Sequence, residues 1–219
     1  VSLIEGSPDI GGTRTSIAMQ AAEVLGIRAA DVQPTVVNTD LIGFTGLTAG
    51  SRTTFATGWA AYEAAQDVKQ QMIERAAFIM ETDSKYIDMQ NGVFTNTKSP
   101  DLAMPFKELA SKLDSTGGPI MGQSTVNPKG VGASASGCIV DLEVDPETGK
   151  VTILRFTGFQ DAGKAVHPSY VEGQIQGGSV QGIGWGINEE YFYGPEGNLT
   201  NSTFLDYRMP TALDLPIID

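Results

Sequence analysis

The strongest pattern in the sequence is a run of apolar residues at spacings of three and four, from about residue 53 to residue 80. This spacing puts the apolar side chains on one face of a helix. Hydrophobic residues make up 41% of the chain, which is enough to bury such a face in a sizeable core. The predicted face consists of Phe55, Trp59, Tyr62, Ala65, Val68, Met72, Ala76 and Ile79.

Shorter patterns predict the elements around this helix. A second helix is expected at residues 13–25, with Gly26 as its C-cap. Asn91-Gly92 predicts a tight hairpin turn, and residues 145–149 predict a turn between two long strands at 133–144 and 150–160. Further expected elements are strands at 1–5 and 34–37, helices at 106–113 and 170–184, and a hairpin that turns at 194–198. The sequence therefore predicts a mixed α+β fold, with antiparallel hairpins packed with helices, in two portions at 1–130 and 131–219.

Charge and residue counts exclude several classes of function. The formal net charge of −12 disfavours nucleic acid and anionic membrane surfaces as partners. The single cysteine, Cys138, excludes iron–sulfur and zinc sites of the cysteine-rich kind in this chain, and its alternating surroundings predict a buried structural thiol. The single histidine, His167, is interpreted as a turn or cap residue rather than a metal ligand.

No stretch of sequence indicates a membrane span or a secretory leader. No apolar run approaches 18 residues, and no basic segment followed by an apolar run opens the chain. We therefore expect a cytoplasmic location and no membrane partner. Strand-like runs at residues 1–4 and 216–219 lead us to expect that the chain is a piece of a longer one.

Two glycine-rich loops each precede a predicted helix. Backbone N–H groups at a helix start are free and favour an anion, so the loop at 6–15 could receive a phosphate, although an ordinary tight turn explains it equally well. In the loop at 48–53, Ser51 or Thr53 could cap the next helix without any ligand. Arg52 is harder to explain, because a cation at a helix start is unfavourable unless an anion offsets it.

A third segment concentrates glycine inside a predicted helix. Glycines at 173, 177, 178, 182 and 184 each cost about 0.5–1 kcal/mol relative to alanine. Either another helix or a flat cofactor must therefore approach closely. The amides of Gln174, Gln176 and Gln181 suit the edge of a heterocycle.

The order of these segments resembles the molybdopterin-binding part of the xanthine dehydrogenase/aldehyde oxidase family. The sequence QDAGKAVHP at 160–168, the glutamine- and glycine-rich helix after it, and the runs at 189–197 and 206–210 carry the resemblance, which covers essentially the whole chain. The similarity is greatest to the bacterial group that includes carbon monoxide dehydrogenase large subunits.

The resemblance implies a set of cofactor contacts. Gly11, Gly12 and Thr13 fall on the loop that wraps the pterin and its phosphates, Ser51, Arg52 and Thr53 fall on a second cofactor loop, and Gln174 falls on a glutamine that contacts the cofactor. Many relatives carry Gly-Gln-Gly where this chain has Ile10-Gly11-Gly12, so one glutamine contact is missing. The implied cofactor is molybdopterin with molybdenum, with the cytosine dinucleotide form as one option, and with no iron–sulfur cluster or FAD in this chain.

The resemblance also implies a reaction, the hydroxylation of an aldehyde, an N-heterocycle or CO with water as the oxygen source. The family's general base, a glutamate in a Gly-x-Gly-Glu motif, is absent from the sequence and is expected downstream, so no catalytic residue and no metal ligand is assigned here. Expected partners are the remainder of the subunit, iron–sulfur and FAD modules, and a small-molecule substrate. Two alternatives stay open: a simple phosphate- or nucleotide-binding domain, and a scaffold without a cofactor.

Overall fold

A computed structural model describes residues 1–130 and 132–219 of the chain. The chain divides into two compact units, Val1–Val131 (unit 1) and Gly132–Asp219 (unit 2). The boundary expected from the sequence touches residue 131, which lies outside the described residues. Helices are combined with sheets of only two or three strands, and this confirms the predicted α+β class.

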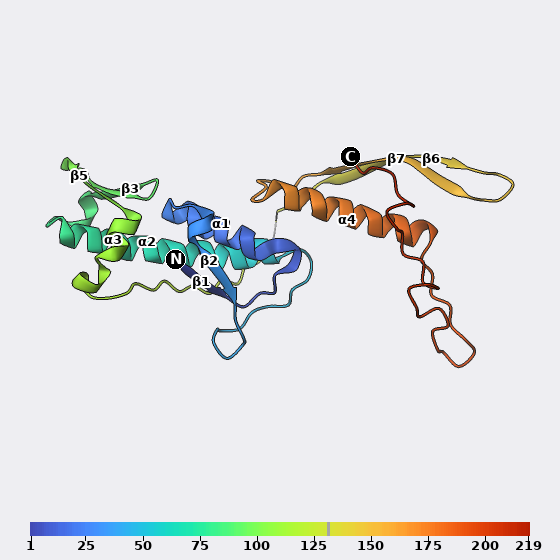
Figure 1. Ribbon diagram of the computed structural model, residues 1–219, viewed down its shortest axis with the longest axis horizontal. Coiled ribbons are helices and arrows are strands. Elements are labelled where there is room, and N and C mark those ends of the chain that lie inside the picture. Colours follow the sequence, from blue (N-terminus) through green and yellow to red (C-terminus); the bar gives the residue numbers. More distant parts are fainter. Residues whose placement is uncertain (131) are drawn as a thin grey trace. The chain divides into compact units, whose positions relative to one another are not determined.

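Unit 1 is built on two helices that pack against each other, α1 (Thr13–Leu25) and α2 (Thr53–Ile79) (Figure 1). A parallel pair of strands, β1 (Ser2–Glu5) and β2 (Gln33–Val36), lies beside α1. An antiparallel sheet contacts α2 and is followed by a short helix; these elements are β3 (Ile87–Gln90), β4 (Val93–Asn96), β5 (Ser99–Pro105) and α3 (Phe106–Ser111). The 3-10 turns are η1 (Ile10–Gly12), η2 (Ala29–Asp31), η3 (Ser84–Tyr86) and η4 (Leu113–Thr116).

The end of α1 shows why glycine is required at one particular turn. Gly26 caps the helix with φ +59°, a left-handed conformation that side chains disfavour. A Cβ at Gly26 would also clash with the backbone nitrogen of Gly92, in the predicted Asn91-Gly92 turn. Two tight turns therefore pack back to back and join α1 to the β3–β4 hairpin.

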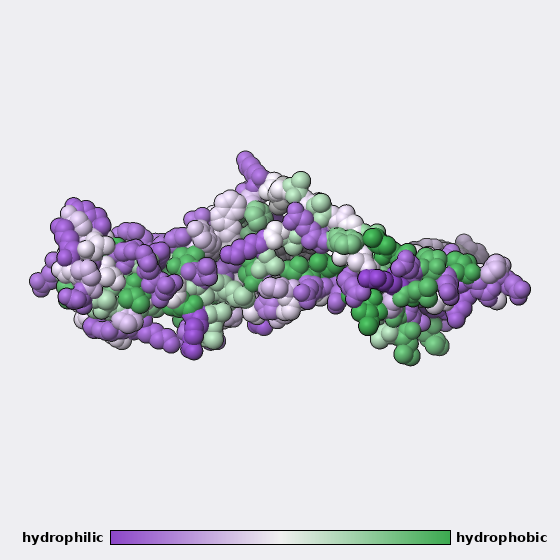
Figure 2. Space-filling view, turned by 90° about the horizontal axis from the view of Figure 1, so that it is seen from above, coloured by the Kyte–Doolittle hydropathy of each residue, from purple (hydrophilic) through white to green (hydrophobic). Residues whose placement is uncertain are grey.

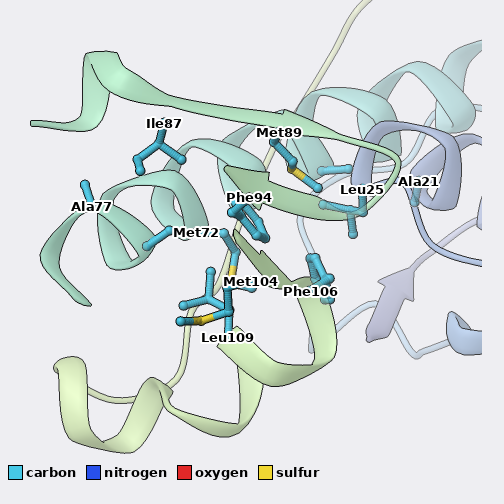
Figure 3. Packing of buried hydrophobic residues seen from close by; sticks show 12 residues of the cluster. Ala21, Leu25, Met72, Ala77, Ile87, Met89, Phe94, Met104, Phe106 and Leu109 are labelled. Carbon is cyan, nitrogen blue, oxygen red and sulfur yellow. The ribbon is translucent and has the colours of Figure 1, made fainter. Parts of the chain in front are cut away.

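The main core of unit 1 brings both helices, the three-stranded sheet and α3 together (Figure 3). Phe94, Met72 and Leu109 are fully buried in it. The rings of Phe94 and Phe106 stack with their centroids 6.3 Å apart. Burial of large apolar side chains of this kind is the principal stabilising contribution in a small domain.

The predicted apolar face of α2 is correct in its C-terminal half and wrong in its N-terminal half. Ala65, Met72 and Ala76 are buried, but the three aromatic residues before them are each more than 40% exposed: Phe55, Trp59 and Tyr62. The small residues Ala56, Gly58 and Ala61 are buried instead. The reason is a close approach of α1, whose Gln20 amide lies against Gly58 and donates to the Thr54 carbonyl at 3.1 Å.

Unit 2 consists of a long hairpin and one helix. The strands are β6 (Ser136–Val144) and β7 (Val151–Gln160), and α4 (Pro168–Ile187) packs against β7. The last residues of the chain pair with β7 as well: the Gly158 amide donates to the Asp219 carbonyl at 2.8 Å, and the Asp219 amide donates to the Phe156 carbonyl at 3.0 Å. The hairpin predicted around 194–198 reduces to a single bridge between Tyr193 and Leu199.

Most side chains of unit 2 are exposed, and Figure 2 shows hydrophobic residues gathered on its surface. Every residue of β6 is exposed, including Cys138, so the prediction of a buried thiol is wrong. A two-stranded hairpin covered by one helix leaves most of its surface open. Alternation in the sequence predicted the hairpin correctly but could not predict whether either of its faces is covered.

Candidate functional site

The loop between β1 and α1 has the geometry expected of a close backbone turn. Gly11 and Gly12 take φ values of +58° and +76°, and Gly12 is the N-cap of α1. The Asp9 carboxylate accepts a hydrogen bond from the Arg14 amide at 3.0 Å and pairs with the Arg14 guanidinium, also at 3.0 Å. An acidic side chain therefore already occupies the start of α1, which weakens the prediction that a phosphate binds at Gly11–Gly12 through the helix dipole alone.

The loop before α2 folds onto the loop before α1. A Cβ at Gly6 would clash with the Ile42 side chain and lie 2.6 Å from the Thr45 hydroxyl. The buried Ser7 hydroxyl lies 2.6 Å from the Thr57 hydroxyl on α2. Two segments that are about 40 residues apart in the sequence are thereby joined at the start of α2.

A small cavity lies at this junction. Its volume of about 20 Å³ accommodates roughly one water-sized group. Five of the nine residues that line it carry a hydroxyl group, and the full wall consists of Ser7, Thr45, Gly46, Leu47, Thr48, Arg52, Thr53, Ala56 and Thr57. Hydroxyl donors beside one guanidinium form a set that suits an anionic oxygen.

Arg52 is the one cationic side chain in that wall. It is itself the N-cap residue of α2, and no side chain caps the helix, so the predicted capping by Ser51 or Thr53 is wrong. Ser51 adopts φ +57° on the exposed loop, whereas Thr53 is buried at the first helical position. The Arg52 guanidinium packs against Gly46, and within residues 1–130 and 132–219 it forms no ion pair.

Glu5 is a residue of this region that the sequence reasoning missed. Only 6% of it is exposed, and in the described part of the chain neither carboxylate oxygen has a hydrogen-bond partner. Burial raises the pKa of Glu5 to about 7, against the smaller lowering effects of the Ser7 amide and Arg14. Its position two residues after Leu3, which packs on α1, was the available signal, because alternate residues of a strand share a face.

The glycine-rich helix α4 belongs to unit 2, whereas the other predicted site residues belong to unit 1. Gln174 is exposed. Nothing described lies within 4 Å of a Cβ placed at Gly173, Gly177, Gly178 or Gly182. Packing of another helix in unit 2 therefore does not explain these four glycines.

His167 begins α4, as the turn interpretation predicts. Its carbonyl accepts from the amides of Tyr170 and Val171, and its ring stacks on Tyr170 at 3.7 Å. The Ser169 hydroxyl lies 3.2 Å from Nδ1. The described residues contain no group of three or more histidine, cysteine or acidic side chains arranged to hold a metal.

Residues 1–216 match the family model of the molybdopterin cofactor-binding domain. The chain belongs to this family. The match confirms the resemblance seen in the sequence. It also confirms the function that the resemblance implied, which is cofactor binding in molybdenum hydroxylases.

The relatives of this molybdopterin-binding domain are much longer proteins. The chain is 30% identical to the 6-hydroxypseudooxynicotine dehydrogenase complex subunit gamma of Paenarthrobacter nicotinovorans, covering 100% of this chain and 28% of that protein. It is 30% identical to the putative xanthine dehydrogenase molybdenum-binding subunit XdhA of Escherichia coli K12, covering 100% and 30%. The crystal structure of a Cu,Mo-CO dehydrogenase superposes with a TM-score of 0.86 at 27% identity, covering 98% of this chain and 28% of that one.

The residues of this molybdopterin-binding domain have side chains whose chemistry fits the molybdopterin cofactor. The Arg52 guanidinium and the hydroxyls around it suit phosphate oxygens, and the open glycine positions of α4 leave space for a flat ring system.

None of the helices in the described residues has the length and apolar character needed to cross a membrane.

Proposed function

We propose that this domain holds the molybdenum cofactor of a hydroxylase through the junction of its two loops. The observation that supports this proposal most is Arg52, a cation at a helix start with no ion pair in the described chain and with hydroxyl groups around it. A cation at that position is unfavourable unless an anion is nearby, and the phosphate of the cofactor is such an anion.

Each predicted contact residue has a proposed role. Ser51, Arg52 and Thr53 bind phosphate oxygens. Gly11, Gly12 and Thr13 bring the backbone close to the pterin, and Gln174 holds its heterocyclic edge. We also propose the cytosine dinucleotide form, which has two phosphates, with Arg52 and the hydroxyl groups near it binding one of them.

The proposed reaction of the whole protein is the hydroxylation of an aldehyde, an N-heterocycle or CO, with water as the oxygen source. When bound, the cofactor supplies the redox chemistry, while the residues of this chain bind it, orient it and exclude water. One relative is a subunit of a dehydrogenase complex, and this supports a larger assembly. The proposal includes iron–sulfur and FAD modules as partners of this assembly and a cytoplasmic location.

The alternatives are a domain that binds only a simple phosphate or nucleotide, and a scaffold without a cofactor. The family match over residues 1–216 favours neither. Release of a fluorescent pterin from the denatured protein, together with molybdenum analysis, separates all three.

Arg52→Ala tests the proposal in the intact protein. A lost charge-assisted hydrogen bond is worth about 1.5–3 kcal/mol, so we expect retention of the cofactor to weaken by about ten- to a hundredfold. Arg52→Lys should retain part of it. The matched control is Arg28→Ala, which removes an exposed guanidinium paired with Asp31 on the same unit. Equal molybdenum and pterin contents in Arg52→Ala and Arg28→Ala would overturn the role of Arg52.

A further inference from the structure

Glu5 lies beneath the loop to which the proposed function assigns cofactor binding. It is the last residue of β1, on the face that turns toward α1, and the glycine loop begins at the next position. Its carboxyl group is covered, and it is the only side chain with buried, unpartnered oxygen or nitrogen atoms found in the described residues. A buried polar group without a partner is costly, and its presence in a native fold requires an explanation.

The charges around Glu5 do not stabilise a carboxylate there. Asp9 and Arg14 are the charged groups close enough to act on it, and they pair with each other at 3.0 Å. The neighbouring strand β2 consists of Gln33, Pro34, Thr35 and Val36, none of which ionises. The fold therefore accommodates Glu5 as a neutral acid, and this agrees with the pKa of about 7 that burial gives to its carboxyl group.

Ionisation of Glu5 would require water at a position that is now closed. The loop that follows Glu5 lies beside the carboxyl group, because the Ser7 amide is near enough to lower its pKa. That loop is held by contacts that can be broken locally, the Ser7–Thr57 hydroxyl pair and the packing of Ile42 on Gly6. Opening of this loop is thus the most direct way to hydrate the charge.

We propose that Glu5 is a positioning residue that works as a neutral acid: its protonated form allows the loop at residues 6–13 to stay closed, and its ionised form releases the loop and its cofactor. The effect on the cofactor rests on the proposed function, whereas the effect on the loop does not. One proton is involved, so retention of the cofactor changes by at most about tenfold per pH unit.

The test measures two quantities in the intact protein between pH 5.5 and 8.5. The first is the rate at which molybdenum and pterin are lost. The second is hydrogen exchange of the amides at residues 6–13, corrected for the intrinsic effect of pH on exchange. We expect both rates to rise through neutral pH in the wild-type protein and to stay flat in Glu5→Gln, whose side chain is neutral at every pH. Glu23→Gln removes an exposed glutamate from α1 and should behave like the wild type.

The outcomes separate the two proposals. If corrected exchange at residues 6–13 of the wild-type protein does not change with pH, the proposed role of Glu5 is overturned. This measurement uses only the wild-type protein, so it does not depend on whether a variant folds. The same pH dependence in Glu5→Gln as in the wild type would overturn it as well. A wild-type protein that contains neither molybdenum nor pterin at any pH would overturn the proposed function, while the exchange measurement would still decide the role of Glu5.

Discussion

The two units of the chain bury their side chains to very different degrees. In unit 1, helices and strands enclose a core in which Phe94 and Leu109 are completely buried. In unit 2, all of β6 and most of α4 are exposed, and Phe156 and Ile183 are the buried hydrophobic side chains among its described residues. Similar apolar patterns in the sequence thus lead to a closed core in one unit and to open faces in the other.

This difference shows which unit has a closed core of its own. The contacts of unit 1 explain its fold but leave two residues unexplained: Glu5, which precedes the first proposed cofactor loop, and Arg52, which lies on the second. Many apolar side chains of unit 2 are exposed, and no contact among the described residues covers them. Large exposed apolar patches of this kind mark interaction sites. Matched substitutions in the two units test this difference in burial.

The largest contrast is expected between Phe94→Ala and Phe159→Ala. Phe94 is 0% exposed, so its loss should cost about 3–5 kcal/mol of unfolding free energy in unit 1. Phe159 is 54% exposed, so its loss should cost about 0.5 kcal/mol or less. Urea unfolding measures both. A cost of about 2 kcal/mol or more for Phe159→Ala would contradict the prediction and indicate that another part of the protein covers β7.

Glycine substitutions should differ in sign between the units. Gly26→Ala forces a side chain into a left-handed conformation and against the Gly92 backbone, so we expect a loss of at least about 1–2 kcal/mol. A Cβ at Gly178 meets open space, so Gly178→Ala should stabilise α4 by up to about 1 kcal/mol without cofactor. Thermal unfolding of cofactor-free protein measures both. Destabilisation by Gly178→Ala would show that α4 is closely packed after all.

The stability of unit 1 should depend on pH through Glu5. Its pKa rises from 4.5 in the unfolded chain to about 7 in the folded one, so the folded chain binds the proton more tightly. The stability is then complete below about pH 4.5 and is lost as the pH rises toward 7. Because opening of the loop at residues 6–13 would hydrate the carboxylate, as proposed above, we expect the loss to be on the order of 1–2 kcal/mol. Urea unfolding of the wild-type protein and of Glu5→Gln at pH 5 and pH 7.5 measures this loss. An equal change of unfolding free energy with pH in the two proteins would contradict the prediction.

The smallest effect is expected at Cys138. The thiol is exposed on β6, so Cys138→Ser should change the unfolding free energy by no more than about 0.5 kcal/mol. A cost of 1–3 kcal/mol, the range for a buried group that loses its partner, would restore the interpretation of a buried thiol. A thiol reagent added to the folded protein gives an independent measurement, since an exposed cysteine reacts quickly.

Local signals predicted most of the elements. The helix at 13–25, its Gly26 cap and the Asn91-Gly92 turn were correct because each depends on neighbouring residues. Burial was harder to predict, because it depends on which distant element covers a face. That is why the aromatic residues at the start of α2 and Cys138 were assigned wrongly.

The loops of the site were identified from glycine content, but their contacts could not be derived from it. The meeting of Ser7 with Thr57 joins residues 50 positions apart, and local sequence carries no information about such a pair. Glu5 was missed for the same reason: an acidic residue at the end of a strand is usually solvated, and only the covering loop shows otherwise. The roles of Gly11, Gly12, Thr13, Ser51, Arg52, Thr53 and Gln174 remain predictions.

The pairing of residue Ile218 with Phe156 has a consequence for the order of folding. All residues of the buried core of unit 1 precede position 110, so that core can form while the rest of the chain is still being synthesised. The edge of β7 pairs with a residue that lies about 60 positions later in the sequence, and contacts between residues so far apart in the sequence form slowly. During this interval the hairpin presents an unprotected strand edge, and chaperones that shield such edges should associate with unit 2 rather than with unit 1.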